Sequence, residues 1–266
     1  MSTSSSPDTP AVIVEHFDTY ASLTLNRPAS YNALSEEMMA ALQEALNTLA
    51  QDSRLHCIVI KAAGKAFCAG HNLKEMRAQP EQAYYERLFQ QCSKMMQSIV
   101  HFPVPVIAQV HGMATAAGCQ LVASCDLALA SDDASFAVSG INVGLFCSTP
   151  AVALSRNIGS KAALEMLMTG RFISAAQAQA QGLINHSVPG PDLATATQEL
   201  VQAICSKSPA AVRTGKAMFY KQAALPLEQA YDYAGHVMAC NMMHADATEG
   251  IDAFIEKRPA VWGKTA

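Results

Sequence analysis

Charged residues are scarce in this 266-residue sequence: they make up 15% of it, while hydrophobic residues make up 50%. The formal net charge is −4 and no run of Lys and Arg exceeds two residues, so the chain lacks the basic surface that nucleic-acid binding requires. No apolar run approaches the roughly 18–20 residues that cross a bilayer. We therefore expect neither a nucleic-acid nor a membrane partner. The apolar surplus instead suggests burial against sister subunits.

Cysteine pairs of the CxxC type are also absent, although the chain contains eight cysteines. Several lie within apolar stretches, where a free cysteine behaves as a small hydrophobic residue. The expected compartment is therefore reducing, namely the cytoplasm. Residues 1–10 are rich in Ser, Thr and Pro and contain no Arg, which predicts a disordered tail rather than a signal or transit peptide. No metal site is predicted.

Hydrophobic periodicity predicts alternating strands and helices in the first half of the chain and helices alone in the second half. The predicted strands are Val12–Glu15, Tyr20–Leu25, His56–Lys61, Val106–Val110, Leu127–Ala130 and Ser135–Ala137. The predicted helices are one that opens at Ser35, then Glu81–Val100, Ala114–Ser124, Pro150–Arg156, Ser160–Leu167, Ala175–Gln181, Leu193–Ser206, Pro209–Gln222, Leu227–Cys240 and Ala247–Glu256. The fold class is therefore α/β, with a helical C-terminal extension.

Two segments share one design, a strand followed by a turn rich in Gly and Ala and then a helix. One runs from Ile58–Ile60 into Gly64–Gly70, and the other from Val106–Val110 into Gly112–Gly118. Such turns expose backbone N–H groups where a helix begins. If both turns face one point, two N–H donors can bind a single carbonyl oxygen as an oxyanion hole. The alternative is that the small residues only allow close packing, which is the better interpretation of either segment alone.

Taken together, these segments resemble the crotonase (enoyl-CoA hydratase/isomerase) superfamily. The resemblance rests on Asn26-Arg27-Pro28 with Asn32-Ala33-Leu34, on Lys65-Ala66-Phe67-Cys68-Ala69-Gly70-His71-Asn72-Leu73, on Gln109-Val110-His111-Gly112 through Gly118-Cys119-Gln120-Leu121, and on Leu167-Met168-Thr169-Gly170-Arg171. It runs in order from about Val12 to Trp262. The implied fold is the crotonase ββα spiral over residues 11–205, with a helical trimerisation region over residues 206–266.

The resemblance also implies roles for individual residues. The backbone N–H groups of His71 and Ala117 correspond to the donors of the oxyanion hole. The residues implied to contact coenzyme A are Arg27, Ala69, His71, Asn72, Leu73, Lys74, Phe254 and Lys257. Ala69–Leu73 is expected to hold the adenine, with Arg27 and Lys74 near the phosphates. Coenzyme A is expected as part of an acyl-CoA thioester substrate, and no tightly bound cofactor is expected.

Two residues depart from the pattern of a hydratase, which uses two glutamates to activate water and deliver a proton. Gln120 stands at the first glutamate position and Gly140 at the second. Neither an amide nor a glycine transfers a proton near pH 7, and each lost acid–base group costs on the order of 10²–10⁴ in rate. Efficient hydration is therefore not expected. Glycine at 140 also suggests a backbone angle that glutamate resists.

No other titratable residue is placed by a motif to replace the glutamates. Asp126 and Cys147 are expected to be structural, and His111 is expected to pack beside a strand end. Asp132 and Asp133 are expected to be solvated, and the His71 ring to contact solvent or coenzyme A. No role is assigned to Glu75 or Glu165. Gly70–Met76 and Asn142–Pro150 further resemble the enoyl-CoA hydratase domain-containing protein 3 subgroup, which has the same departures.

Three functions stay open at this point. The first is an enzyme of fatty acid metabolism that uses the oxyanion hole with an unidentified acid or base, or with groups of the substrate. The second is a hydratase or isomerase with a substitute acid or base. The third is a non-catalytic acyl-CoA-binding module. In each case the resemblance implies self-association as a homotrimer or a dimer of trimers.

Overall fold

The computed structural model describes residues 9–263, so most of the predicted N-terminal tail lies outside the described residues. The larger of two sheets has the strand order β1 (Val12–His16), β2 (Tyr20–Leu25), β3 (Cys57–Ala62), β5 (Val106–Val110), β7 (Leu127–Ser131) and β10 (His186–Val188). The smaller has the order β4 (Ala66–Cys68), β6 (Met113–Thr115), β8 (Ser135–Ala137) and β9 (Ile173–Ser174). Among the described residues, only the β1–β2 and β8–β9 pairs are antiparallel.

The chain winds as a spiral, because each turn places one strand in the larger sheet and the next strand in the smaller one. The strand pairs β3–β4, β5–β6 and β7–β8 follow this order, and a helix comes after each pair. Glycines allow successive turns to touch: a Cβ on Gly112 would lie 2.6 Å from the carbonyl oxygen of Lys65, and one on Gly118 would lie 2.1 Å from that of Cys68. The expected ββα spiral is confirmed.

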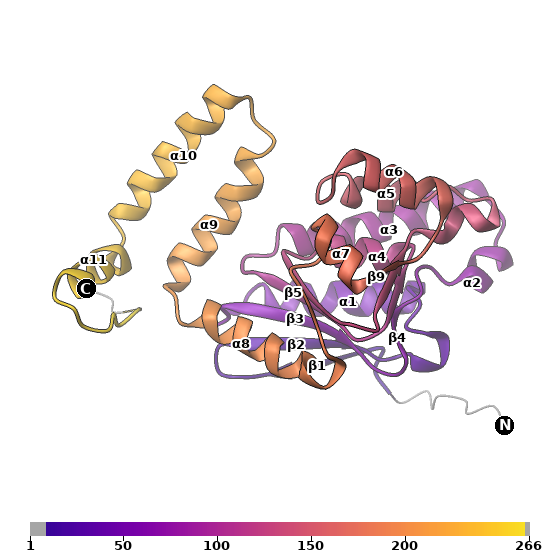
Figure 1. The fold of residues 1–266 in the computed structure, drawn as a ribbon, viewed down its shortest axis with the longest axis horizontal. Coiled ribbons are helices and arrows are strands. Elements are labelled where there is room, and N and C mark those ends of the chain that lie inside the picture. The colour runs from indigo at the N-terminus through magenta and orange to yellow at the C-terminus, as the bar shows by residue number, and fades with distance from the viewer. Residues whose placement is uncertain (1–8, 264–266) are drawn as a thin grey trace.

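Helices cover the spiral (Figure 1). They are α1 (Glu36–Leu49), α2 (Leu73–Ala78), α3 (Gln82–Val100), α4 (Ala117–Ser124), α5 (Ser148–Leu154), α6 (Ser160–Thr169), α7 (Ala175–Gln181) and α8 (Leu193–Cys205). Ser35 caps α1, since its side-chain oxygen accepts a hydrogen bond from the N–H of Met38 at 3.1 Å. The apolar stripe of this helix, Met39, Leu42, Leu46 and Leu49, is buried in the core.

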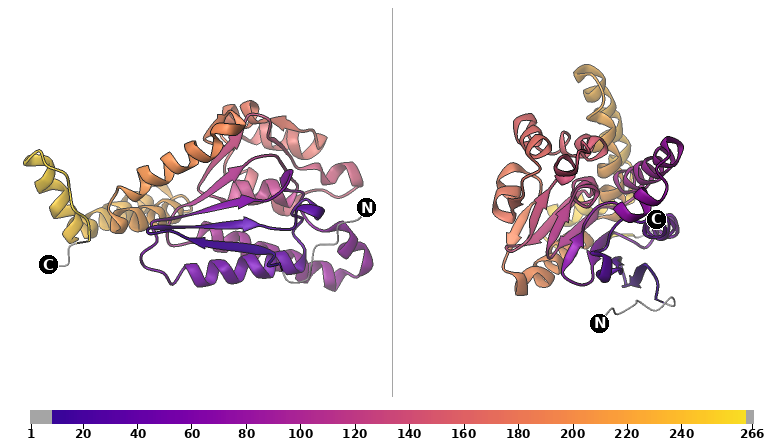
Figure 2. Two further views of the ribbon diagram at one scale, coloured as in Figure 1. Left: turned by 90° about the horizontal axis from the view of Figure 1, so that it is seen from below. Right: turned by 90° about the vertical axis from the view of Figure 1, so that its right-hand side faces the viewer.

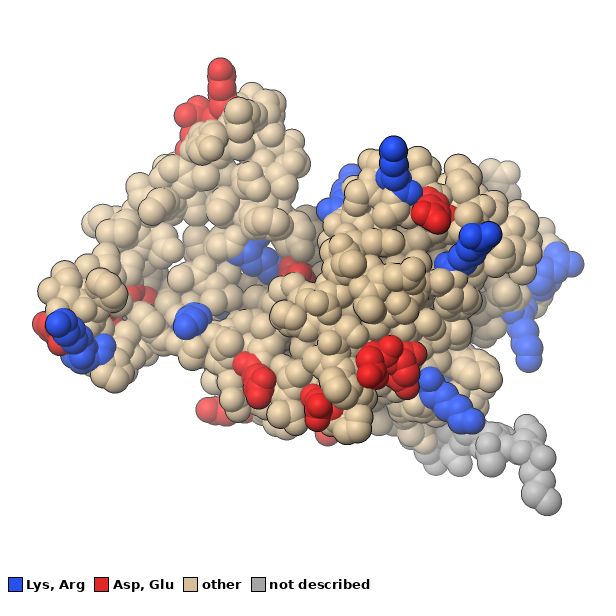
Figure 3. All heavy atoms as spheres, in the orientation of Figure 1, with Lys and Arg blue, Asp and Glu red and all other residues tan. Residues whose placement is uncertain are grey.

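The last three helices, α9 (Pro209–Gln222), α10 (Leu227–Met242) and α11 (Ala245–Ile255), form an arm that extends away from the spiral (Figure 1, Figure 2). We call α9–α11 the C-terminal arm. Neither α9 nor α10 contains a buried residue. In the face drawn in Figure 3 the arm is largely uncharged. Much of the largely uncharged surface of the arm is therefore not buried by the rest of residues 9–263.

The predicted turns differ from the structure in one respect. Gly64–Gly70 contains β4 and Gly112–Gly118 contains β6, so the helix expected from Ala114 begins only at Ala117. Strands of three residues carry little propensity of their own, and pairing between neighbouring turns of the spiral determines them. The short helix α2 was not predicted. No helix among residues 9–263 has the length and apolarity to span a membrane.

Candidate active site

The two glycine-rich segments meet where β4 and β6 run side by side. Cys68 pairs with Ala114 in parallel register, and a Cβ on Gly70 would lie 3.1 Å from the backbone nitrogen of Ala117. The Gly70–His71 peptide therefore lies against the start of α4. Within residues 9–263, the N–H groups of His71 and Ala117 have no hydrogen-bond acceptor. Two adjacent, unpaired backbone donors are what an oxyanion hole requires.

Backbone strain at Ala116 contributes to this arrangement. Ala116 has φ 52° and ψ −120°, in a region that alanine rarely adopts and that costs on the order of 1–3 kcal/mol. Its own N–H donates to the carbonyl oxygen of Ala137 at 2.9 Å. This one residue turns strand β6 directly into helix α4. Ala117 thus becomes the first helical residue, whose N–H has no partner within the helix.

The Nε2 atom of the His71 imidazole is shielded from solvent, while the expected contact of this ring with coenzyme A stays a prediction. The ring packs edge-to-face on Phe89 of α3, with centroids 5.4 Å apart, and its Nε2 has no hydrogen-bond partner within residues 9–263. Burial lowers the pKa of His71 to about 4. The side chain is therefore neutral near pH 7. Phe89 carries no motif, so its part in the site was not predictable.

Gln120 lies one helical turn after Ala117, and residues three apart share one face of a helix. Its side chain is only 4% exposed, and its Oε1 has no hydrogen-bond partner in the described part of the chain. A buried amide without a partner costs about 1–3 kcal/mol, so this position is one where a ligand or a water is expected to bind.

The second glutamate position is filled by a thiol. A Cβ on Gly140 would lie 2.7 Å from Sγ of Cys147 and 2.5 Å from the carbonyl oxygen of Leu145. Gly140 does not have a positive φ, so the expected backbone-angle obstacle to glutamate is wrong: the obstacle is space. Cys147 is buried, and burial raises the pKa of its thiol. Its structural role as a filler of this space fits the prediction.

The carboxylates that could replace the two missing glutamates form other contacts or lie at the surface. Asp126 accepts hydrogen bonds from Lys216 Nζ at 2.7 Å, the Tyr220 hydroxyl at 2.8 Å and the backbone N–H of Val106 at 2.6 Å. Glu75 accepts a bond from the first N–H of α1 at 3.2 Å. Asp132 is exposed, Asp133 accepts from Ser131, and Glu165 lines a cavity of about 110 Å³ beside α6 and α7.

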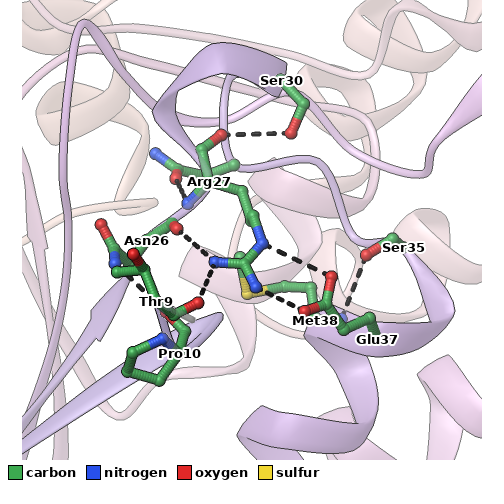
Figure 4. Close-up of polar contacts among 9 residues, drawn as sticks. Thr9, Pro10, Asn26, Arg27, Ser30, Ser35, Glu37 and Met38 are labelled. Carbon is green, nitrogen blue, oxygen red and sulfur yellow. Dashed lines mark hydrogen bonds and ion pairs between the residues drawn. The ribbon is translucent and has the colours of Figure 1, made fainter. Parts of the chain in front are cut away.

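The residues predicted to hold coenzyme A are only partly free. The guanidinium of Arg27 pairs with Glu37 and donates to the carbonyl oxygens of Thr9 and Asn26, each at 2.9 Å (Figure 4). It is therefore already occupied. Asn72 caps α2 by accepting the N–H of Lys74 at 3.1 Å. The Lys74 side chain is exposed and forms no ion pair within residues 9–263.

Phe254 and Lys257 are not brought to the other predicted residues within one chain. Phe254 lies on α11 and is 84% exposed. Figures 1 and 2 show α11 at the far end of the molecule from α2 and β4. A single protomer therefore presents the oxyanion segments and Ala69–Leu73 without these two residues.

The chain matches the family model described as Enoyl-CoA hydratase/isomerase over residues 16–265. It is 46% identical over 254 residues to enoyl-CoA hydratase domain-containing protein 3, mitochondrial, of Xenopus laevis, covering 96% of this chain and 86% of that protein. The human protein of that name is 47% identical over 245 residues, with 92% and 81% covered.

Among solved structures, an enoyl-CoA hydratase from Mycobacterium smegmatis has a TM-score of 0.94 at 56% identity, covering 96% of this chain and 99% of that chain. The human enoyl-CoA hydratase domain-containing protein 3 has a TM-score of 0.92 at 46% identity, covering 95% and 100%. The fold and the subgroup resemblance are therefore confirmed.

One expectation is overturned by these comparisons. The relatives from Xenopus laevis, mouse and human are named as mitochondrial, which contradicts the expected cytoplasmic compartment. The physical reason is that reduced cysteines indicate a reducing compartment and do not distinguish one such compartment from another.

Proposed function

Because the chain belongs to the enoyl-CoA hydratase/isomerase family, we propose that it binds an acyl-CoA and polarises the thioester carbonyl with the backbone N–H groups of His71 and Ala117. The observation that carries the proposal is the pair of adjacent, unpaired donors at the start of α4 and after Gly70. Backbone donors do not depend on side-chain identity, so an imidazole at position 71 does not remove the donor.

In this proposal Ala69–Leu73 holds the adenine, and Lys74 supplies charge near the phosphates. We assign no phosphate contact to Arg27, because Glu37 and two carbonyl oxygens occupy its guanidinium. Phe254 and Lys257 then cover coenzyme A from a neighbouring subunit, since α11 lies far from α2 within one chain.

The chemistry we propose is not efficient hydration. Gln120, Cys147 and the neutral His71 give this site hydrogen-bonding groups but no carboxylate to activate water. Any proton transfer in the reaction must therefore rely on groups of the substrate or on water. The alternative of a hydratase with a substitute carboxylate finds no support in the contacts of Asp126 or Glu75.

Calorimetry with acetyl-CoA and with free coenzyme A tests the proposal, because only the thioester has a carbonyl to polarise. We expect acetyl-CoA to bind more tightly than coenzyme A. Ala117→Pro removes one donor and should reduce this preference by roughly 2- to 10-fold, the value of one hydrogen bond. Ala117→Gly, which keeps the N–H, is the control. Folded protein that binds neither ligand at millimolar concentration would contradict the proposal.

A further inference from the structure

A second cluster of reactive side chains lies away from the oxyanion segments, where β3 begins and α8 ends. Cys57 is the first residue of β3 and is fully buried, whereas Cys205 is the last residue of α8 and is half-buried. Both pack in one apolar cluster on the outer face of the larger sheet, together with Val59, Ile107 and Leu129. Two thiols from distant parts of the sequence therefore share one small space.

Contacts of His56 and Tyr20 hold α8 against the start of β3. His56, the residue before Cys57, places its Nδ1 3.3 Å from the carbonyl oxygen of Cys205. The N–H of His56 donates to Thr19 at 2.7 Å, and the hydroxyl of Tyr20 donates to Gln198 of α8 at 3.0 Å. These contacts hold the last turns of α8 beside the residues that flank Cys57.

Cys57 and Cys205 share this cluster, and their surroundings make the two thiols unequal. The neighbouring Cys57 thiol, followed by the Thr19 side chain and the charge of His56, lowers the pKa of Cys205 below its ordinary value. The neighbouring Cys205 thiol and burial raise the pKa of Cys57. Cys205 is thus the more exposed and the more readily ionised of the two, and Cys57 is the buried one, which is the arrangement of an attacking and a resolving cysteine.

We propose that Cys205 is a site of oxidation by peroxides and that Cys57 is its resolving thiol. The Cys205 thiolate attacks one oxygen of hydrogen peroxide, the O–O bond breaks and hydroxide leaves, so the sulfur becomes a sulfenic acid. The Cys57 sulfur then attacks the Cys205 sulfur, the S–O bond breaks, and the thiol proton and the departing hydroxyl leave as water. The product is a Cys57–Cys205 disulfide, which a dithiol reduces back to the two free thiols of this structure.

The position of this pair gives the disulfide a structural consequence. It would join the start of β3 to the end of α8, directly before the chain enters the C-terminal arm at Pro209. The oxidised protein would therefore have the base of the arm covalently fixed to the central sheet. This inference does not depend on the proposed acyl-CoA function.

The test begins with alkylation of the full chain at pH 6, followed by peptide mass spectrometry. At that pH a thiol whose pKa is lowered is ionised to a larger fraction than an ordinary thiol, whose pKa is near 8.5. A thiolate of low pKa is also intrinsically less nucleophilic, which reduces the difference in alkylation rate. We expect Cys205 to react roughly tenfold faster than Cys240, the exposed cysteine of α10. Equal or slower reaction of Cys205 would overturn the inference.

Treatment with a small excess of hydrogen peroxide then tests the resolving step. The wild-type protein should yield a Cys57–Cys205 linked peptide that dithiothreitol removes. Cys57→Ser should stop at a sulfenic acid on Cys205, trapped by dimedone, while Cys205→Ser should leave Cys57 reduced. Circular dichroism verifies that both variants are folded. Folded wild-type protein that forms no such linkage, or that links Cys240 instead, would contradict the proposal.

Discussion

Two buried side-chain atoms in the candidate active site, Nε2 of His71 and Oε1 of Gln120, have no hydrogen-bond partner among residues 9–263. Each such atom costs about 1–3 kcal/mol in the unliganded protein. Both belong to the segments that supply the oxyanion donors. The protein is therefore less stable than it would be with both atoms hydrogen-bonded, at the position where a ligand is expected to bind. This pattern is typical of functional sites.

Gln120→Met is the first test at this scale, since methionine has a similar shape and no amide. We expect the free energy of unfolding to rise by about 1 kcal/mol, because a buried polar atom without a partner is removed. Binding of acyl-CoA should weaken if the amide contacts the acyl group or a water beside it. Urea unfolding and calorimetry measure the two effects. A loss of stability without a change in binding would show that the amide is structural.

His71 predicts a dependence of stability on pH. Its pKa of about 4 in the folded protein lies below the ordinary value of 6.5, so the unfolded chain binds more protons between these values. This contribution to stability is complete above pH 6.5 and is lost as the pH falls to 4; it amounts to about 3 kcal/mol. His71→Gln should lose less stability than wild type over this range in urea unfolding. Parallel pH profiles for the two proteins would contradict the burial of the ring.

Gly140 is constrained by space, and this predicts a coupled response with Cys147. Gly140→Ala should reduce the free energy of unfolding by about 1–3 kcal/mol, because the new Cβ meets a sulfur and a carbonyl oxygen. Adding Cys147→Ala removes the sulfur and should recover part of the loss. Gly159→Ala, which meets no atom within 4 Å, is the control. Additive effects in thermal unfolding would contradict the contact. Gly140→Glu should accordingly fail to restore hydration.

Among the elements, the strands of the larger sheet and the long helices follow from hydrophobic periodicity, and Val106–Val110 and Pro209–Gln222 were predicted to the residue. The short strands β4 and β6 were not predicted, because pairing with neighbouring turns of the spiral determines them. The motifs located the oxyanion segments through their glycines. They could not show that Cys147 fills the space beside Gly140, since this contact depends on how residues 144–147 fold back onto the turn that contains Gly140.

The attachment of α9 to the spiral depends on a buried ion pair. Lys216 donates to Asp126 and to the carbonyl oxygens of Ile99 and Val104, at 3.2 and 3.0 Å. Lys216→Met leaves the carboxylate with fewer partners and should cost about 3–5 kcal/mol. The double variant Lys216→Met/Asp126→Asn should lose less than the sum of the two single losses. Urea unfolding of the four proteins completes the cycle, and strict additivity would show that the pair does not act as a unit.

On the scale of the whole molecule, the C-terminal arm is a part whose apolar surface one chain leaves exposed. Large apolar side chains of α10 and α11 are mostly exposed: Tyr231 by 74%, Met238 by 72% and Phe254 by 84%. Such a surface marks an interface between proteins. The composition of the chain agrees with such an interface, since 50% of the residues are hydrophobic and the spiral does not bury the hydrophobic residues of α10.

We therefore predict that the protein associates through this arm, as a trimer or a dimer of trimers of the 28.3 kDa chain. Sedimentation equilibrium should give three or six times that mass at micromolar concentration. Met238→Glu places a charge in the predicted interface and should shift the mass toward the monomer, whereas Gln229→Glu on the same helix should not. Since Phe254 and Lys257 are proposed to reach coenzyme A of a neighbouring subunit, dissociation should also weaken acyl-CoA binding although every residue of the oxyanion segments is unchanged. A monomeric wild-type protein with a fully helical arm would contradict both the association and this shared site, because the exposed face of α10 would then be stable in water alone.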